Sequence, residues 1–489
     1  MVWTSIQRFA KMGIQFISGI ILARLLMPED YGAIGMLTIF MLVAQSFLDG
    51  GFGAALIQKK RPTQEDYSTI FWWNLGMAIV LYLILFVSAP YIAKFYRMPI
   101  LSDVLRVQAL VLIISALSLV QANQLRKQFK FKKIAIISLI SSVISLTITI
   151  WMAYRGYGVW ALVAQGLLMH FLPTVMYWFT NKWFPKLVFS KESFKSLFSF
   201  GAYMFLVHLI NEICNNIQGL LIGRIYNAST MGYYSKARST EKLASTSISQ
   251  SLTQITFPLY AEVQDDKQRL IGLIKKLTGV IAYVTFPLMF VLILVAEPVF
   301  VFLYSDRWLP SVPYFQILCV AGLAVCLQSV NLQAISAIGK SRTVFSWTLI
   351  KRAVGLVLVI GGLWLWGVKG LLVGMVIQSW MLYLINAYLV SKHIGYEMRR
   401  QMFDLLPIMV LSILAFAVGM IPSLFPLGLY VKGIMEFIFF IAVYWGISRI
   451  TKLSNYQDFI EILPMIVGKF RKKAVSGEKE NIQENKLSC

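Results

Sequence analysis

Apolar runs of about 20 residues, each long enough to cross a bilayer as an α-helix, recur from one end of this chain to the other. The polar gaps between them are short, so no gap holds a separate soluble catalytic domain. The composition agrees: 58% of the residues are hydrophobic, 14% are charged and the mean hydropathy is +0.70. Soluble domains carry about a quarter charged residues. The sequence therefore predicts an all-α polytopic membrane protein.

The apolar runs predict about fourteen transmembrane spans. They lie near 4–26, 32–57, 68–90, 104–123, 134–153, 157–180, 196–223, 231–259, 272–296, 312–337, 343–366, 369–390, 404–422 and 429–449. The predicted organisation is an N-lobe of six spans, a cytoplasmic linker, a C-lobe of six spans, two extra spans and a cytoplasmic tail. Their ranges are 1–180, 181–195, 196–392, 404–450 and 451–489. In the tail, apolar residues from 459 to 470 share a helical face beside a basic run, which favours a helix on the inner leaflet, and the end is expected to be disordered.

Basic residues gather in every second loop, whereas the loops between are nearly neutral or acidic. The basic loops include Lys59, Lys60 and Arg61 after the second span, and Arg126, Lys127 and Lys130 after the fourth. The positive-inside rule places these loops and both termini in the cytoplasm. It also explains the net charge of +23 without a nucleic-acid partner. The four cysteines and three histidines show no metal-ligand spacing, so neither a metal nor another cofactor is expected.

One motif occurs twice. Gly19, Arg24 and Gly32 recur 200 residues later as Gly219, Arg224 and Gly232. The preceding polar stripe recurs at the same offset, with Arg8, Lys11, Gln15 and Ser18 answered by His208, Asn211, Asn215 and Gln218. Further along the chain the offset becomes 208. Pro90, Tyr96 and Asn123 then correspond to Pro298, Tyr304 and Asn331. Because each lobe has an even number of spans, the repeats are expected to be related by an axis along the membrane normal.

Polar groups inside a bilayer are costly, so they usually face a cavity or a partner. The eighth span has the longest polar stripe, consisting of Ser235, Arg238, Lys242, Ser245, Ser249, Thr253 and Thr256. The first, second, seventh and eighth spans are therefore the predicted walls of a water-filled cavity. Cations outnumber carboxylates there, which suits an anionic substrate such as a pyrophosphate. The predicted substrate-binding residues are Arg8, Lys11, Arg24, Asp49, Arg224, Arg238 and Lys242.

Structural interpretations compete with these assignments. The serines and threonines of the eighth span can pack helices together. Arg24 and Arg224 stand near turns, where they can snorkel or bind carbonyl groups. Asp49 precedes Gly50 and can bond the local backbone. The sequence offers no nucleophile–base pair, so no catalytic residue and no enzymatic activity are assigned.

The segment from Gly19 to Gly32, followed by Asp49-Gly-Gly-Phe-Gly-Ala-Ala-Leu-Ile-Gln58, resembles the polysaccharide-transporter branch of the MOP superfamily. It is similar to the Wzx-type flippases of the colanic-acid and teichuronic-acid exporter subgroup, with two MATE/MurJ-like six-helix lobes plus two extra helices. The resemblance implies a V-shaped transporter with a cationic cavity in the bacterial inner membrane. It would flip undecaprenyl-pyrophosphate-linked oligosaccharide by alternating access.

The resemblance further implies coupling to a proton or sodium gradient, for which Asp49, Glu212 and Glu241 are the candidate carboxylates. It implies membrane lipids and a polysaccharide polymerase or export machinery as partners. Two other functions stay open. A MATE-like drug/cation antiporter would share the lobes, but it would favour an acidic cavity. A membrane polymerase or ligase would need catalytic groups on a large outer loop, which the sequence does not contain.

Overall fold

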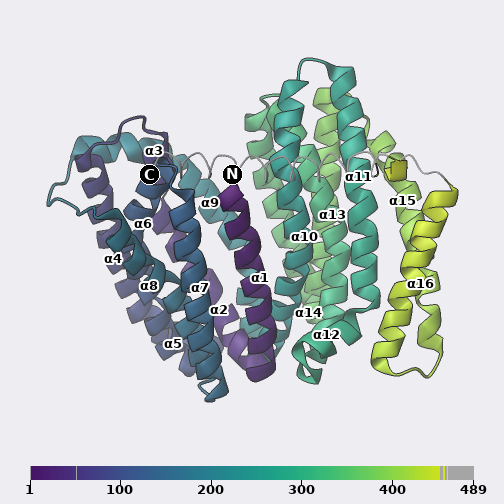
Figure 1. Ribbon diagram of the computed structural model, residues 1–489, viewed down its shortest axis with the longest axis horizontal. Coiled ribbons are helices and arrows are strands. Elements are labelled where there is room, and N and C mark those ends of the chain that lie inside the picture. Colours follow the sequence, from purple (N-terminus) through teal and green to yellow (C-terminus); the bar gives the residue numbers. More distant parts are fainter. Residues whose placement is uncertain (1, 51, 452–454, 458–459, 461–489) are drawn as a thin grey trace, which may run out of the picture. The chain divides into compact units, whose positions relative to one another are not determined.

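The fold is seen in a computed structural model, which describes residues 2–50, 52–451, 455–457 and 460. These residues form helices and turns with no β-strand, so the predicted all-α membrane fold is confirmed. The chain divides into two compact units, Met1–Ser235 and Lys236–Cys489, and α10 runs through the division. Figure 1 shows each unit as a bundle of long helices.

The first unit contains helices α1 to α9 and the start of α10. They are α1 Val2–Leu25, α2 Pro28–Asp49, α3 Phe52–Gln58, α4 Gln64–Tyr96, α5 Ile100–Gln108, α6 Leu110–Lys127, α7 Phe131–Tyr154, α8 Val159–Asn181, α9 Lys191–Ile225 and α10 Ala228–Glu262. The second unit contains the rest of α10 and the helices that follow. They are α11 Lys267–Leu294, α12 Ala296–Tyr304, η1 Asp306–Ser311, α13 Val312–Ala337, α14 Ser341–Ile394, α15 Met398–Gly419, η2 Ile421–Leu424 and α16 Leu429–Ile450.

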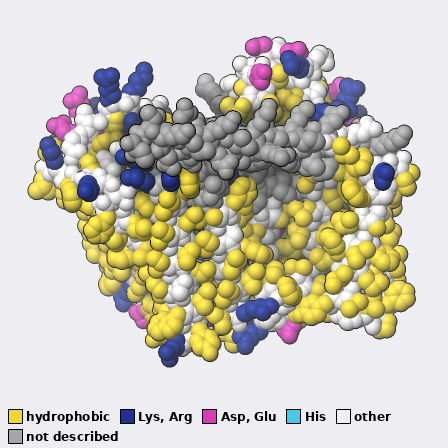
Figure 2. Space-filling view, viewed as in Figure 1, with side chains coloured by type: hydrophobic (Ala, Val, Ile, Leu, Met, Phe, Trp, Pro, Cys, Tyr) yellow, Lys and Arg dark blue, Asp and Glu magenta, His cyan; other side chains and the backbone are white. Residues whose placement is uncertain are grey.

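All fourteen predicted spans fall on helices. Among the described residues, ten helices are long and apolar enough to cross a membrane. One of these covers two predicted spans, because α14 continues across a kink at Trp366 and Gly367. The long helices outside this set are α1, α9 and α10, and these are the polar first, seventh and eighth spans. Hydrophobic side chains cover the middle of the helices, and charged ones gather near their ends (Figure 2).

The predicted second span, 32–57, is wrong as a single helix. α2 ends at Asp49, because Gly50 adopts a left-handed conformation with φ of 39°, and the short helix α3 begins at Phe52. The fourth span likewise consists of α5 and α6, which meet at Ala109. The predicted tail helix over 459–470 lies almost entirely outside the described residues.

Local signals in the sequence fix several helix starts. Pro28 opens α2, and the Asp30 carboxylate accepts a hydrogen bond from the Met27 backbone N–H at 2.9 Å. Thr63 opens α4 in a capping box, since its Oγ1 accepts from Asp66 N–H while Asp66 Oδ2 accepts from Thr63 N–H. These caps satisfy backbone N–H groups that have no partner within the helix.

In the first unit, α4, α6, α8, α7 and α1 pack in succession, and α9 packs along α2. The predicted linker lies against the start of α4. Trp72 Nε1–H donates to the Lys186 carbonyl at 2.8 Å, and Lys186 N–H donates to Ser68 Oγ at 3.0 Å. Ser190 N–H donates to Thr69 Oγ1 at 3.0 Å. The division into compact units falls after Ser235, beyond this linker, and the six-span lobes stay a prediction.

The internal repeat is visible in the packing of two tyrosines. Tyr96 donates a hydrogen bond to the Met36 carbonyl at 3.1 Å, and its ring lies 6.3 Å from that of Phe40. In the second unit, Tyr304 contacts Lys236 and Thr240, which lie 200 positions after Met36 and Phe40. Lys236 Nζ lies 3.8 Å from the Tyr304 ring centroid, and Thr240 Oγ1 lies 3.1 Å from the Tyr304 hydroxyl. Equivalent residues therefore meet in both copies.

Candidate functional site

Three of the four helices predicted to line the cavity, α1, α9 and α10, are long helices that fall outside the ten membrane-span candidates of the described residues. On α1, Arg8 is half-buried, whereas Lys11 and Arg24 are exposed. Asp49 ends α2, and its side chain lies outside the described set. The Lys11 ammonium interacts electrostatically with His170 on α8, and His170 Nδ1 lies 3.0 Å from Ser115 Oγ on α6. Polar groups of α6 and α8 are therefore in contact, and the charge of Lys11 on α1 acts on them.

A second polar group lies between α2 and α9. Ser46 Oγ is 3.3 Å from His208 Nδ1, and His208 Nε2 is 4.0 Å from Glu212 Oε1. Asn216 Nδ2 donates to the other Glu212 oxygen at 3.1 Å. Glu212, a predicted candidate for ion coupling, thus belongs to a chain of polar contacts that joins two helices.

The two copies of the repeated motif meet in the first unit. A β-carbon added to Gly32 would lie 1.8 Å from the Ala228 carbonyl oxygen, and one added to Gly232 would lie 1.9 Å from the Pro28 carbonyl oxygen. Helices α2 and α10 therefore cross with their backbones in contact, and each copy supplies one glycine. Next to this crossing, Ser229 Oγ donates to Glu29 Oε1.

The motif arginines stand in the last turns of α1 and α9, where cations stabilise the helix dipole. Arg224 is exposed, and its guanidinium carbon lies 5.0 Å from the Phe95 ring centroid. That contact fits the structural interpretation of Arg224. Binding of substrate by Arg24 and Arg224 stays a prediction.

On α10 the structure brings two predicted site residues together. Arg238 Nη1 lies 3.2 Å from Glu241 Oε2, and only 1% of the Glu241 side chain is exposed. Among the described residues, the other Glu241 oxygen, Oε1, is buried and has no hydrogen-bond partner. The Arg238 side chain is 28% exposed, and Lys242 is exposed, so both can meet an anion from the solvent side.

The predicted polar stripe of α10 does not face one environment throughout. Ser245 and Thr256 are buried, as the helix-packing alternative expects, whereas Arg238 and Lys242 keep solvent access. The Thr253 side chain lies outside the described set. The exposed cationic part of the stripe is therefore its first two turns.

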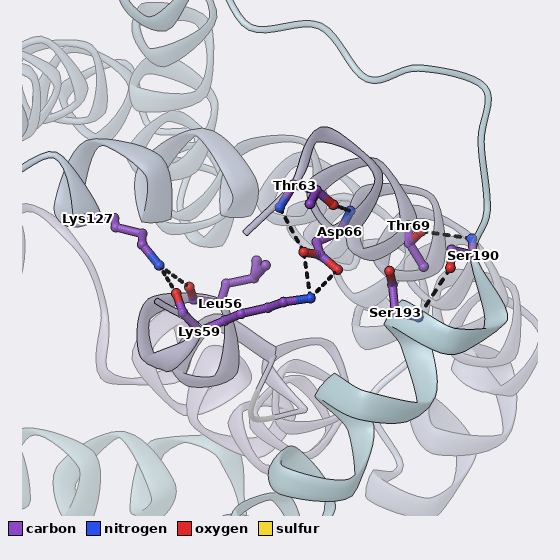
Figure 3. A network of polar contacts seen from close by, with 8 residues as sticks. All are labelled: Leu56, Lys59, Thr63, Asp66, Thr69, Lys127, Ser190 and Ser193. Carbon is purple, nitrogen blue, oxygen red and sulfur yellow. Dashed lines mark hydrogen bonds and ion pairs between the residues drawn. The ribbon is translucent and has the colours of Figure 1, made fainter. Parts of the chain in front are cut away.

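A polar network ties α3, α4 and α6 together at the predicted cytoplasmic side (Figure 3). Lys59 Nζ lies 2.8 Å from both carboxylate oxygens of the buried Asp66. Lys127 Nζ donates to the carbonyl groups of Leu56, Ile57 and Lys59, which end α3. The basic residues of these two loops therefore bind the end of α3 and pair with a carboxylate.

The roles of Ser46, Asn216 and Lys236 do not follow from the predicted polar stripes. The i,i+4 spacing of His208, Glu212 and Asn216 was a readable signal, because residues at that spacing are neighbours on a helix. Ser46 comes from another helix, and no local pattern connects it to His208. Lys236 is buried against Tyr304 and Trp308, which only the fold brings together.

Comparison with known proteins places these features in a family. A family model described as "Polysaccharide biosynthesis protein" matches residues 21–313. The chain belongs to this family. The match includes both copies of the repeated motif from residue 21 on, together with α2, α9 and α10, so the resemblance predicted from sequence is confirmed at family level.

Two relatives from bacteria cover most of the chain. The teichuronic acid biosynthesis protein TuaB of Bacillus subtilis (strain 168) is 28% identical over 347 residues, which are 71% of this chain and 72% of the relative. The succinoglycan biosynthesis transport protein ExoT of Rhizobium meliloti (strain 1021) is 26% identical over 352 residues, or 71% of each chain.

The fold is similar to a solved structure of the lipid II flippase MurJ in an inward closed conformation. The TM-score is 0.76 with 16% identity, over 94% of this chain and 100% of MurJ.

Proposed function

We propose that this protein flips an undecaprenyl-pyrophosphate-linked oligosaccharide, the repeat unit of an O-antigen, capsule or exopolysaccharide, to the outer leaflet of the bacterial inner membrane. One observation carries the proposal. Among the long helices of the described chain, α1, α9 and α10 fall short of membrane-span apolarity, and they bear the cations Arg8, Lys11, Arg238 and Lys242. Family membership supports a substrate drawn from polysaccharide biosynthesis.

The physical task matches these features. A sugar chain and a pyrophosphate cannot enter hydrocarbon without losing their hydration, whereas a polyprenyl tail is stable there. Solvent-accessible guanidinium and ammonium groups can bind the pyrophosphate, and the guanidinium can do so through two hydrogen bonds. Under this proposal the two six-span lobes alternate between inward and outward access, the basic loops and both termini lie in the cytoplasm, and a proton or sodium gradient supplies energy. Polymerase or export machinery would take over the product.

The antiporter alternative shares the fold but needs a different site. A cationic drug would be repelled by Arg238 and Lys242, and among the described site residues Glu241 already pairs with Arg238. The membership in a polysaccharide-biosynthesis family also favours the flippase.

The test is flipping by the purified protein in proteoliposomes. A polyprenyl-pyrophosphate oligosaccharide is loaded, and its exposure to a membrane-impermeant sugar-oxidising reagent is followed with and without an ion gradient. We expect exposure that depends on the protein and fails in the double variant Arg238→Ala/Lys242→Ala. The matched control, Lys60→Ala/Arg61→Ala, removes two exposed cations from a loop and should flip normally. Dye export without glycolipid flipping would contradict the proposal.

A further inference from the structure

The polar group between α2 and α9 has a defined arrangement of donors and acceptors. Ser46 is 98% buried, and the neighbouring rings of Phe47 and Phe205 pack 4.9 Å apart, so the two helices are in close contact at this level. Ser46 Oγ donates its proton to the Leu42 carbonyl at 2.8 Å. Its oxygen is therefore left to accept a hydrogen bond.

This direction favours one tautomer of the neighbouring imidazole. His208 Nδ1 lies 3.3 Å from Ser46 Oγ, and with the hydroxyl hydrogen on the Leu42 carbonyl this contact is a hydrogen bond in the tautomer that carries hydrogen on Nδ1. A neutral imidazole has one N–H group, so Nε2 then holds a lone pair. Nε2 lies 4.0 Å from Glu212 Oε1, which is also an acceptor when ionised. Asn216 Nδ2 occupies the other carboxylate oxygen. In that tautomer Nε2 and an ionised Glu212 Oε1 are both acceptors, and the His208 side chain is 58% exposed, so solvent reaches the pair.

We propose that Ser46, His208, Glu212 and Asn216 form a proton-binding site, in which one proton binds between His208 Nε2 and Glu212 Oε1. When the proton is present, imidazolium donates from Nδ1 to Ser46 on α2 and from Nε2 to Glu212 on α9. When it leaves, the Nε2 lone pair faces a carboxylate, and repulsion turns the ring away from Ser46. Proton binding therefore stabilises the contact between α2 and α9, and proton release weakens it.

Helices α3, α4, α5, α6 and α8 pack against α2 or α9. In α5, α6 and α8 the titratable side chains are Asp103, Arg106, Arg126, Lys127, His170 and Tyr177. In α3, Phe52–Gln58 has none. In α4 the charged residues occupy the end turns, and its tyrosines lie elsewhere along the helix: Glu65, Asp66, Lys94, Tyr67, Tyr82, Tyr91 and Tyr96. In α2, Asp49 is three residues after Ser46, with its side chain outside the described set, and Glu29, Asp30 and Tyr31 start the helix. In α9 itself, Cys214 lies two residues beyond Glu212.

The protonation itself can be measured without transport. The chain has three histidines, so imidazole ¹⁵N signals of the full-length protein in nanodiscs can be assigned by substituting one at a time. At alkaline pH we expect His208 in the tautomer with hydrogen on Nδ1. Hydrogen on Nε2 would overturn the site.

The link to transport rests on the proposed function and is tested separately. Flipping is measured with and without a proton gradient, and the ratio of the two rates is compared. We expect a ratio of several-fold in the wild type, a ratio near one in His208→Gln, and the wild-type ratio in the control His393→Gln. A full ratio in His208→Gln, or a response to sodium in place of protons, would refute the coupling. Absence of any flipping in the wild type would refute the proposed function, and the ¹⁵N spectra would then decide the site alone.

Discussion

Replacing Gly232 by alanine tests whether the crossing of α2 and α10 is held by backbone contact. The added β-carbon would lie 1.9 Å from the Pro28 carbonyl oxygen and 2.7 Å from its carbon. Nonbonded carbon and oxygen atoms need about 3 Å or more, so the two helix starts must separate by about 1 Å. Gly32→Ala imposes the same demand from the other copy, at 1.8 Å from the Ala228 oxygen.

Overpacking of this kind costs about 1–3 kcal/mol, whereas alanine in an exposed helix interior gains up to about 1 kcal/mol over glycine. Gly232→Ala should therefore destabilise the crossed state by about 1–2 kcal/mol. That is a shift of roughly 5- to 30-fold away from this conformation. The double variant with Gly32→Ala should cost less than the sum, because one separation of the helices relieves both clashes.

Thiol crosslinking reports the crossing directly. Cysteines replace Glu29 and Ser229, whose side chains are in hydrogen-bond contact, and a short bis-thiol reagent joins them when the helices meet. Gly232→Ala should lower the crosslinking yield and the thermal midpoint of the detergent-solubilised protein. Gly166→Ala is the matched control, since its β-carbon would meet no atom within 4 Å. A Gly232→Ala protein with wild-type yield and thermal midpoint would refute the backbone-contact argument.

Three further substitutions test the charged groups. Arg238→Ala/Lys242→Ala should abolish glycolipid flipping while the protein still inserts, and normal flipping would remove the cationic site. Arg238→Ala alone should lower the free energy of unfolding by about 3 kcal/mol, because buried Glu241 loses its cation. Arg238→Ala/Glu241→Gln should recover most of that stability in thermal unfolding. No recovery would contradict a structural ion pair. Lys127→Met should lower the free energy of unfolding by about 1–2 kcal/mol, because the carbonyl groups at the end of α3 lose their donor. Amide hydrogen exchange at the end of α3 should increase. Unchanged exchange would contradict that contact.

The fold was predictable because hydrocarbon imposes a length and a composition on each span. The sequence places the break in α14 correctly, between spans ending at 366 and beginning at 369, because Gly367 interrupts the apolar pattern. It misses the end of α2 at Asp49, because the apolar sequence resumes at Phe52 directly after the glycines. Hydropathy alone does not register a left-handed residue, and Gly50 has a φ of 39°.

The site was predictable only where it depends on one helix. Helical spacing put Arg238 and Lys242 on one face, and both keep access to solvent. The same spacing also gathered Ser245 and Thr256, which are buried, because a polar stripe does not reveal which neighbour covers it. The contact of Ser46 with His208 needs the packing of α2 on α9, which the sequence expresses only as two separate helices.

The repeat in the sequence does not indicate which residues the two copies of the motif contact. Its spacing indicates two similar turns, and a local interpretation assigns the glycines to those turns. In the structure each copy instead packs against the other, Gly32 on Ala228 and Gly232 on Pro28. Both copies lie in the first compact unit, so this contact is internal to that unit. Glycine allows it, because only a residue without a side chain lets two helix backbones approach this closely. The residues that recur most plainly in the sequence therefore mark the backbone contact between α2 and α10.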